Sequence, residues 1–151
     1  MAFLPVKLWA TPTRITALCC SQGSAIYVGG EQGLVSRFVP GSSDPPLRAT
    51  TATGVSIDAL GLVARKLAVL SNGCVSLLDA DTLELVKTID CGGSTCTGIL
   101  CRRDKLVISL TDRRLLVSDE HSGRVLRELY VSDSVLSMAW FGSHALVLAS
   151  S

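Results

Sequence analysis

The sequence predicts an all-β fold in which a unit of four short strands repeats along the chain. Two observations carry this prediction. Short apolar runs alternate with turn-forming Gly, Asn, Asp and Ser, as in KLAVLSNGCVSLLDADTLELVKTI at 66–89, and the pattern returns after a shift of 40 residues. Helix start and stop patterns are nearly absent. Each unit is therefore expected to fold as an antiparallel meander.

The 40-residue shift aligns strand positions and turn positions together. The aligned apolar positions are Tyr27, Leu67, Val107 and Val147; Val28, Ala68, Ile108 and Leu148; and Cys20, Leu60, Leu100 and Trp140. The aligned turn positions are Gly33, Gly73 and Arg113; Asp79 and Asp119; and Thr82 and Ser122. Because one interval relates both sets, the units are interpreted as structural repeats.

Turn residues set the limits of the strands within each unit. Asn72-Gly73 predicts a two-residue hairpin of type I′, in which both central residues have positive φ. The first unit has three strands between Ile15 and Val39, and a weak fourth strand is expected inside the Pro-, Ser- and Thr-rich segment 40–54. The other strands are expected over 56–62, 66–70, 74–79 and 84–89; over 96–101, 106–110, 114–118 and 124–130; and over 135–140 and 145–149.

Four strands per unit and a period of 40 residues are typical of the blades of a β-propeller. A β-sandwich is the alternative, but it does not require strands and turns to recur in register. We therefore predict a β-propeller fragment of about three and a half four-stranded blades. The blades are placed at about 13–52, 53–93, 94–132 and, incomplete, 133–151.

The predicted blade count implies that residues 1–151 are either the N-terminal part of a longer propeller or the product of a truncated gene model, because propellers close with four to eight blades. The apolar segment 3–9 is expected to supply the outer strand of the last blade of the complete ring. Unpaired strand edges are templates for association, so this stretch alone is expected to be a poor folding unit.

Composition excludes several classes of protein. With 48% apolar and 18% charged residues the chain has enough apolar material for a core, which argues against disorder. The 14 basic and 13 acidic residues give a net charge of +1, which argues against a nucleic-acid partner.

The N-terminus MAFLPVKLWA lacks a basic leader and is interpreted as mature protein. The apolar segment 135–151 is divided by Gly142, Ser143 and His144, so two strands around a turn fit it better than a membrane span.

The cysteines are expected to be core residues. All six lie in or beside apolar runs, and none forms the Cys-x-x-Cys pair of most structural zinc and redox sites. A zinc site or a disulfide framework is the alternative interpretation. Asn72 is the only asparagine and Gly-Cys follows it, so no glycosylation sequon exists, and a reduced, cytoplasmic setting is the simplest interpretation. The six positions are Cys19, Cys20, Cys74, Cys91, Cys96 and Cys101.

Three motifs that resemble reactive or ligand-binding sites have simpler interpretations. GGEQG at 29–33 precedes a strand, whereas a phosphate-binding loop leads into a helix, so a hairpin turn is expected there. His121 and His144 lie in predicted turns without a partner at ligand spacing and are expected at the surface. An acidic group lacks the Gly and the final Glu of a calcium loop and is expected to form a turn; it consists of Asp79, Asp81 and Glu84.

No catalytic, cofactor-binding or metal-binding residue is therefore predicted. No Gly-x-Ser-x-Gly elbow is present for a nucleophile, and no nucleophile, base and orienting group converge in the sequence. The prediction is a protein that is not an enzyme and that uses no cofactor and no small-molecule substrate.

The basic residues are more informative when they are placed on the meander. In each unit the loop after the first strand and the loop after the third strand lie on one face of the ring, and the other loops lie on the opposite face. Arg113 and Arg114 fall on the second face. A cluster of five cations falls on the first, where Asp79, Asp81 and Asp119 are expected to offset part of its charge; it consists of Arg65, Lys66, Arg102, Arg103 and Lys105. A solvated mixed surface is the favoured interpretation, and contact with an acidic partner or an anionic lipid surface is the alternative.

Stretches of this sequence resemble two families of β-propeller. RITALCCSQGSAIYVGGEQGLVSRF looks like the start of a WD40 repeat, but Arg37-Phe38, Leu78-Asp79 and Ser118-Asp119 stand where that family has Trp-Asp. The chain more closely resembles the citron homology (CNH) domain, a degenerate propeller at the N-terminus of vacuolar-sorting tether subunits of the HOPS and CORVET complexes and of their TGF-β-receptor-associated relatives. The stretches that carry this likeness are ITALCCSQGSAIYVGGEQGLVSRF, LAVLSNGCVSLLDADTLELVKTI, KLVISLTDRRLLV and SVLSMAWFGSHALVLAS.

The CNH resemblance implies a non-catalytic interaction propeller in a vesicle-tethering subunit that acts in endosome and vacuole or lysosome trafficking. It implies a Rab-type small GTPase and other tether subunits as partners, and a cytoplasmic location, peripheral on the endosome or vacuole membrane. The WD40 likeness implies the alternative function, a scaffold of an unrelated multiprotein assembly.

Overall fold

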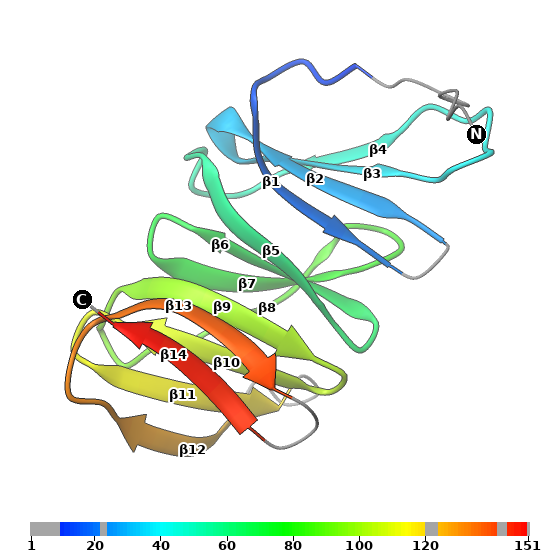
Figure 1. The fold of residues 1–151 in the computed structure, drawn as a ribbon. Coiled ribbons are helices and arrows are strands. Elements are labelled where there is room, and N and C mark those ends of the chain that lie inside the picture. Colours follow the sequence, from blue (N-terminus) through cyan, green and yellow to red (C-terminus); the bar gives the residue numbers. More distant parts are fainter. Residues whose placement is uncertain (1–9, 22–23, 120–123, 142–144, 151) are drawn as a thin grey trace, which may run out of the picture.

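Four antiparallel sheets follow one another along the chain. The computed structural model describes residues 10–21, 24–119, 124–141 and 145–150. Figure 1 shows the sheets in chain order, from the blue strands at the top to the yellow strands below, with the red and orange strands lying against the third sheet. Apart from one short 3-10 turn, every helix or strand in the described residues is a strand. The predicted all-β class is confirmed.

Each of the first three sheets is a four-stranded meander. The first sheet contains β1 (Ile15–Cys20), β2 (Ile26–Gly30), β3 (Leu34–Phe38) and β4 (Leu47–Thr50). The second contains β5 (Ile57–Val63), β6 (Lys66–Ser71), β7 (Cys74–Asp79) and β8 (Leu85–Ile89). The third contains β9 (Cys96–Arg102), β10 (Lys105–Leu110), β11 (Arg114–Asp119) and β12 (Val125–Tyr130). The fourth contains β13 (Val135–Phe141) and β14 (Ala145–Ser150).

The strand limits agree with the sequence prediction to within one residue from β5 onward. The hidden strand expected in the segment 40–54 is β4. At Asn72 and Gly73 both φ angles are positive, +52° and +70°, as the predicted hairpin requires. The motif at 29–33 ends β2 and continues as a 3-10 turn, Glu31–Gly33, into β3, which confirms the predicted hairpin turn.

The uniform 40-residue register is wrong for the second sheet and for β9. A β-bulge interrupts the first strand of every sheet, and the first pair after the bulge is Ala17 with Gly29, Ala59 with Leu70, Gly98 with Ser109, and Ser137 with Ala149. Counting from these pairs, the equivalent positions in the second strands are Tyr27, Ala68, Val107 and Val147, so the prediction for Leu67 is wrong by one residue. In the first strands they are Cys20, Leu62, Cys101 and Trp140, so the predictions for Leu60 and Leu100 are wrong by two residues and by one. The cause is a longer stretch before β5, since 30 residues lead from Gly29 to Ala59 but only 28 lead from Leu70 to Gly98. Within this stretch eight residues separate β3 from β4, whereas five separate β7 from β8.

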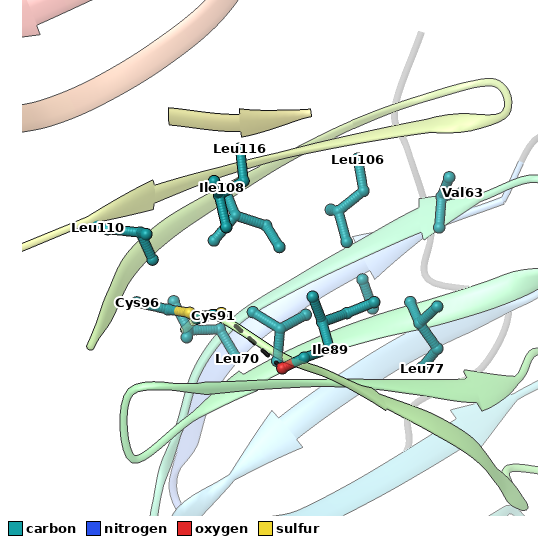
Figure 2. Close-up of a cluster of buried hydrophobic side chains, with 12 residues drawn as sticks. Val63, Leu70, Leu77, Ile89, Cys91, Cys96, Leu106, Ile108, Leu110 and Leu116 are labelled. Atoms are coloured by element: carbon teal, nitrogen blue, oxygen red, sulfur yellow. Dashed lines mark hydrogen bonds between the residues drawn. The ribbon is translucent and has the colours of Figure 1, made fainter. Parts of the chain in front are cut away.

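A one-residue slip matters because it moves a side chain to the other face of its sheet. Tyr27 and Leu67 face each other in the buried cluster between the first and second sheets. Ala68 belongs instead to the cluster between the second and third sheets (Figure 2). These two clusters are the core, and their largest fully buried side chains are Val35, Ile57, Leu67, Val69, Val63, Val75, Leu77, Leu106 and Ile108.

Two glycines let neighbouring sheets approach closely. A Cβ atom on Gly29 would lie 2.6 Å from Cγ2 of Ile57, and one on Gly61 would collide with Sγ of Cys101. Tyr27 adds a directed contact, since its hydroxyl donates a hydrogen bond of 2.7 Å to the carbonyl of Ala80 on the second sheet. The first two sheet interfaces are therefore packed without room for larger side chains.

The cysteine prediction is wrong for two of the six residues. Cys91 and Cys96 are buried and Cys19 and Cys101 are half-buried, but Cys20 and Cys74 are exposed, and all six are free thiols. Cys20 ends β1 on the outer side of the first sheet, where no other described sheet packs, and Cys74 begins β7 directly after its hairpin turn. A cysteine beside an apolar run can therefore still be exposed when it lies at the end of a strand.

Three of the sequence predictions fall outside the described residues. They concern His121, His144 with the rest of the turn 142–144, and the segment 3–9. The two strands predicted for 135–151 are β13 and β14. Among the described residues no helix is long and apolar enough to cross a membrane.

Candidate interaction surface

The loops after the first and third strands gather on one face, as predicted for the cationic cluster. Arg65 lies in the turn between β5 and β6, and Arg103 lies in the turn between β9 and β10. The two turns touch, because the backbone N–H of Ala64 donates a hydrogen bond to the carbonyl of Arg103. The cations of the second and third sheets therefore share one surface.

The acidic residues of the same face offset part of this charge. One Oδ atom of Asp81 lies 3.5 Å from Arg37, and the other lies 4.0 Å from Arg65. Asp79 is used within its own turn, where its carboxylate accepts hydrogen bonds of 2.9 Å from the N–H groups of Asp81 and Thr82. Those N–H bonds, that of Thr82 most, hold the pKa of Asp79 below its ordinary value. The turn-forming prediction for Asp79 is confirmed.

The opposite face carries Arg114, also as predicted. Its guanidinium lies 2.7 Å from Asp112 and 2.7 Å from Glu128, and it donates a hydrogen bond of 3.0 Å to the hydroxyl of Ser94 in the loop between the second and third sheets. The hydrogen bond from Arg114 lowers the pKa of Asp112 to about 2. This network joins two sheets and leaves Arg114 with its charge compensated.

A hollow of about 710 Å³ opens on the third sheet, on the side that faces the fourth. Its apolar lining comes from β10, β11, β12 and β13, and its rim is mainly cationic. The apolar lining consists of Val107, Val117, Leu126, Leu129 and Trp140, and the charged rim consists of Arg102, Arg103, Lys105, Arg127 and Asp104. Four cations against one carboxylate make the hollow a site of positive potential above an apolar floor.

Trp140 and Arg102 join the third and fourth sheets beside the hollow. The guanidinium carbon of Arg102 lies 5.1 Å from the centre of the Trp140 ring, a distance at which a cation is attracted to an aromatic face. Nε1 of Trp140 is enclosed and has no acceptor among the described residues. The side chain of Arg102 is therefore held over the ring at the rim.

The fourth sheet, which contributes Trp140 of β13 to this hollow, has an open edge. Within the described part of the chain, β14 pairs only with β13, so one row of its backbone N–H and C=O groups is unpaired. In the second sheet the corresponding second strand, β6, has a partner on both sides. An open edge beside an apolar hollow is a geometry that accepts an extended strand.

The sequence placed three of the rim cations correctly but missed the hollow. Arg102, Arg103 and Lys105 were predicted to share a face, whereas Trp140 and Arg127 were not connected to them. The signal in the sequence is the run VLRELY at 125–130, whose apolar residues are all exposed in β12. An outer strand that exposes Leu126, Leu129 and Tyr130 together is unusual for a solvated edge.

Comparison with known structures identifies the architecture. The chain aligns with the RRP9 WD40 repeats at a TM-score of 0.79 and 16% identity, over 95% of this chain and 47% of that one. It aligns with the Cps50 (Swd1) beta-propeller domain of Myceliophteria thermophila at a TM-score of 0.76 and 14% identity, over 90% of this chain and 48% of that one. The fold is that of a β-propeller.

A third similar structure matches the length of the chain. It is the computationally designed Ika4 protein, with a TM-score of 0.79 and 18% identity, and the alignment covers 99% of this chain and 93% of that one. The chain spans just under half of the two other propellers. No protein-family model matches the sequence, and no curated protein matches it.

Proposed function

We propose that this propeller is a protein-interaction module and that the hollow on the third sheet binds an extended, acidic and apolar segment of a partner protein. The observation that supports the proposal most strongly is the apolar floor with its cationic rim, next to a β14 edge that is unpaired within the described residues. Backbone hydrogen bonds to β14 would supply affinity, and alternate side chains of the added strand would supply specificity.

The chemistry of the partner follows from the side chains of the hollow. In an extended strand, successive side chains point to opposite sides. Apolar residues at every second position would cover Val117, Leu126 and Leu129, while glutamate or aspartate at the others would reach Arg102 and Arg127 at the rim.

A peptide with alternating valine and glutamate is a direct probe. Leu126→Asp is expected to weaken its binding at least tenfold, because a carboxylate would be placed on the apolar lining next to an acidic ligand. The matched control is Val86→Asp. Val86 occupies the same position of β8 and is 52% exposed, against 54% for Leu126, but it lies outside the hollow. Equal binding by both variants would refute the assignment of the hollow.

The biological setting that we propose is vesicle tethering. The CNH resemblance supports a subunit that acts on endosomes and vacuoles, with a Rab-type small GTPase and other tether subunits as partners, and with a cytoplasmic location peripheral to those membranes. The test is capture of GTP-loaded and GDP-loaded Rab proteins by the protein, together with its enrichment on endosomes or vacuoles. If the protein captured no Rab protein in a nucleotide-dependent way and was not enriched on endosomes or vacuoles, the tethering proposal would be wrong.

The alternative is a WD40-like scaffold without a GTPase partner. The structural likeness to the RRP9 WD40 repeats favours it, since that likeness extends over 95% of the chain. Peptide binding in the hollow combined with no Rab capture would select this alternative. In both cases we propose that the module acts by binding and not by catalysis, and a turnover activity lost on mutation of Asp79 with the fold retained would contradict this.

A further inference from the structure

Two cysteines face each other in the connection between the second and third sheets. Cys91 follows β8 and Cys96 begins β9, and both side chains are buried. Their Sγ atoms are 2.9 Å apart. Figure 2 shows the two sulfur atoms side by side at the edge of the core cluster. Because a disulfide has an S–S bond of about 2.05 Å, a further approach of about 0.9 Å would join them.

The loop that carries the pair is held in place from several sides. Gly92 and Gly93 have φ angles of +64° and +82°, which allow the chain to fold back within four residues. The N–H of Gly92 donates to the carboxylate of Asp90 at 2.8 Å, and the N–H of Cys96 donates to the carbonyl of Gly73 at 2.8 Å. The Sγ–Sγ approach is thus supported by the backbone on each side of the loop.

The hydroxyl of Ser94, at the middle of the loop, is anchored to the third sheet. It donates to Asp112 at 2.6 Å and accepts from Arg114 at 3.0 Å. The cysteines therefore bracket a segment that is tied to the neighbouring strand β11. A bond between them would close a short loop without drawing distant parts of the chain together.

Access to the pair is one-sided. A hollow of about 470 Å³ opens beside the loop, and its lining includes Cys91, Cys74, Gly93 and Ser94 but not Cys96. The thiol of Cys96 is hydrogen-bonded to Cys91, and this contact holds the pKa of the Cys91 thiol below its ordinary value and raises that of Cys96. Asp90 opposes the first shift and Arg114 supports it. Cys91 therefore borders the hollow, and Cys96 does not.

We propose that Cys91 and Cys96 form a reversible thiol–disulfide site that reacts with small-molecule disulfides such as oxidised glutathione. In the first step the Cys91 thiolate attacks one sulfur of the small disulfide, a bond forms between them, and the other half leaves as a thiolate. In the second step Cys96 loses its proton to solvent, its sulfur attacks Sγ of Cys91, and the second glutathione thiolate leaves. Two protein thiols are oxidised and one disulfide is reduced to two thiols.

The site gives the propeller a covalent staple that depends on the redox state. Closing this loop restricts the unfolded chain, so the oxidised protein is expected to be more stable. The expected upward shift of the thermal midpoint is about 5 °C for a chain of this size.

The experiment is a titration of the 151-residue chain with glutathione buffers of graded ratio, followed by alkylation and tryptic mapping. Cleavage after Lys87 and Arg102 gives one peptide, 88–102, with Cys91, Cys96 and Cys101. The expected result is a peptide that has lost two hydrogens and carries one alkyl group on Cys101. Full alkylation of all three cysteines at every ratio, or a bond from Cys91 to Cys74, would overturn the proposal.

Single variants separate the roles of the two thiols. Cys96→Ser is expected to leave one glutathione on Cys91 and to abolish the thermal shift, whereas Cys20→Ser, an exposed cysteine remote from the loop, is expected to behave as the unmodified chain. If the Cys96→Ser variant carried glutathione only on Cys74, Cys91 would not be the thiol that reacts first. If Cys96→Ser does not fold, the titration of the unmodified chain still decides the matter.

Discussion

The second and third sheets present equivalent faces to their next neighbour, but only one of these faces is sealed. On the second sheet, Leu77 and Ile89 are buried under side chains of the third, including Leu106 and Ile108. On the third sheet the corresponding Val117 is half-buried and Leu129 is 38% exposed, and both line a hollow. Residue type alone therefore does not decide which of these sheet faces is buried, because burial depends on whether another sheet covers the face.

The largest expected effect tests that difference directly. Leu77→Ala removes a side chain that is 1% exposed and is expected to lower the free energy of unfolding by ~3 kcal/mol, since a cavity is left in a filled interface. Val117→Ala, at the equivalent position of the third sheet, is expected to cost about 1 kcal/mol because water already reaches the hollow. Urea denaturation of both variants measures the two values. Equal losses would mean that the two faces are equally covered.

A second comparison concerns two tyrosines. Tyr27→Phe removes a buried hydrogen bond to the carbonyl of Ala80 and is expected to cost about 1–2 kcal/mol. Tyr130→Phe is the control, because that side chain is 78% exposed on β12 and its loss of a hydroxyl is expected to be nearly neutral. The midpoint of thermal unfolding ranks the two. A larger loss for Tyr130→Phe would indicate that β12 is covered in solution.

A smaller effect is expected where the third and fourth sheets meet. Arg102→Gln removes the guanidinium from the face of Trp140 and is expected to cost about 0.5–1 kcal/mol. Arg103→Gln, an exposed neighbour in the adjoining turn, serves as the control. Fluorescence of Trp140 in a Trp9→Phe background reports the local change. Identical spectra for Arg102→Gln and the parent would show that the ring and the cation are not in contact.

The smallest expected effect concerns pH and the opposite loop face. The pKa of Asp112 in the folded protein, about 2, lies below its ordinary value of 3.8, so its contribution to stability is present above 3.8 and is lost as the pH falls towards 2. The difference in unfolding free energy between the parent and Asp112→Asn is therefore expected to shrink across that interval. Arg114→Gln should abolish the pH dependence of the difference. A difference that stays constant from pH 5 to pH 2 would contradict the pairing.

Much of the fold was predictable because turn chemistry is local. Asn72-Gly73 and the Asp-rich turn after β7 fix strand limits through their own backbone preferences. The register of β6 is not predictable from a uniform repeat, because the chain from Gly29 to Ala59 is two residues longer than the chain from Leu70 to Gly98 and displaces the count. Loop length carries no periodic signal that a sequence comparison at fixed shift would detect.

The surface features were harder to predict because they join distant residues. The hollow combines side chains of four strands, and Trp140 reaches Arg102 only when the fourth sheet packs on the third. The spacing between Cys91 and Cys96 matches no familiar motif, and their contact depends on the fold-back at Gly92 and Gly93. In both cases the sequence named the right residue types but not their proximity.

Hydrogen–deuterium exchange at β14 tests the central claim, that the uncovered face of the third sheet is a docking surface for an extended strand. The measurement compares the chain alone with the chain saturated by the alternating valine–glutamate peptide. The account predicts slower exchange in β14 on peptide addition, retained in Val86→Asp and lost in Leu126→Asp, with unchanged exchange in β6, which already has two neighbours. Unchanged exchange in β14 with peptide bound, or equal protection in both variants, would contradict it.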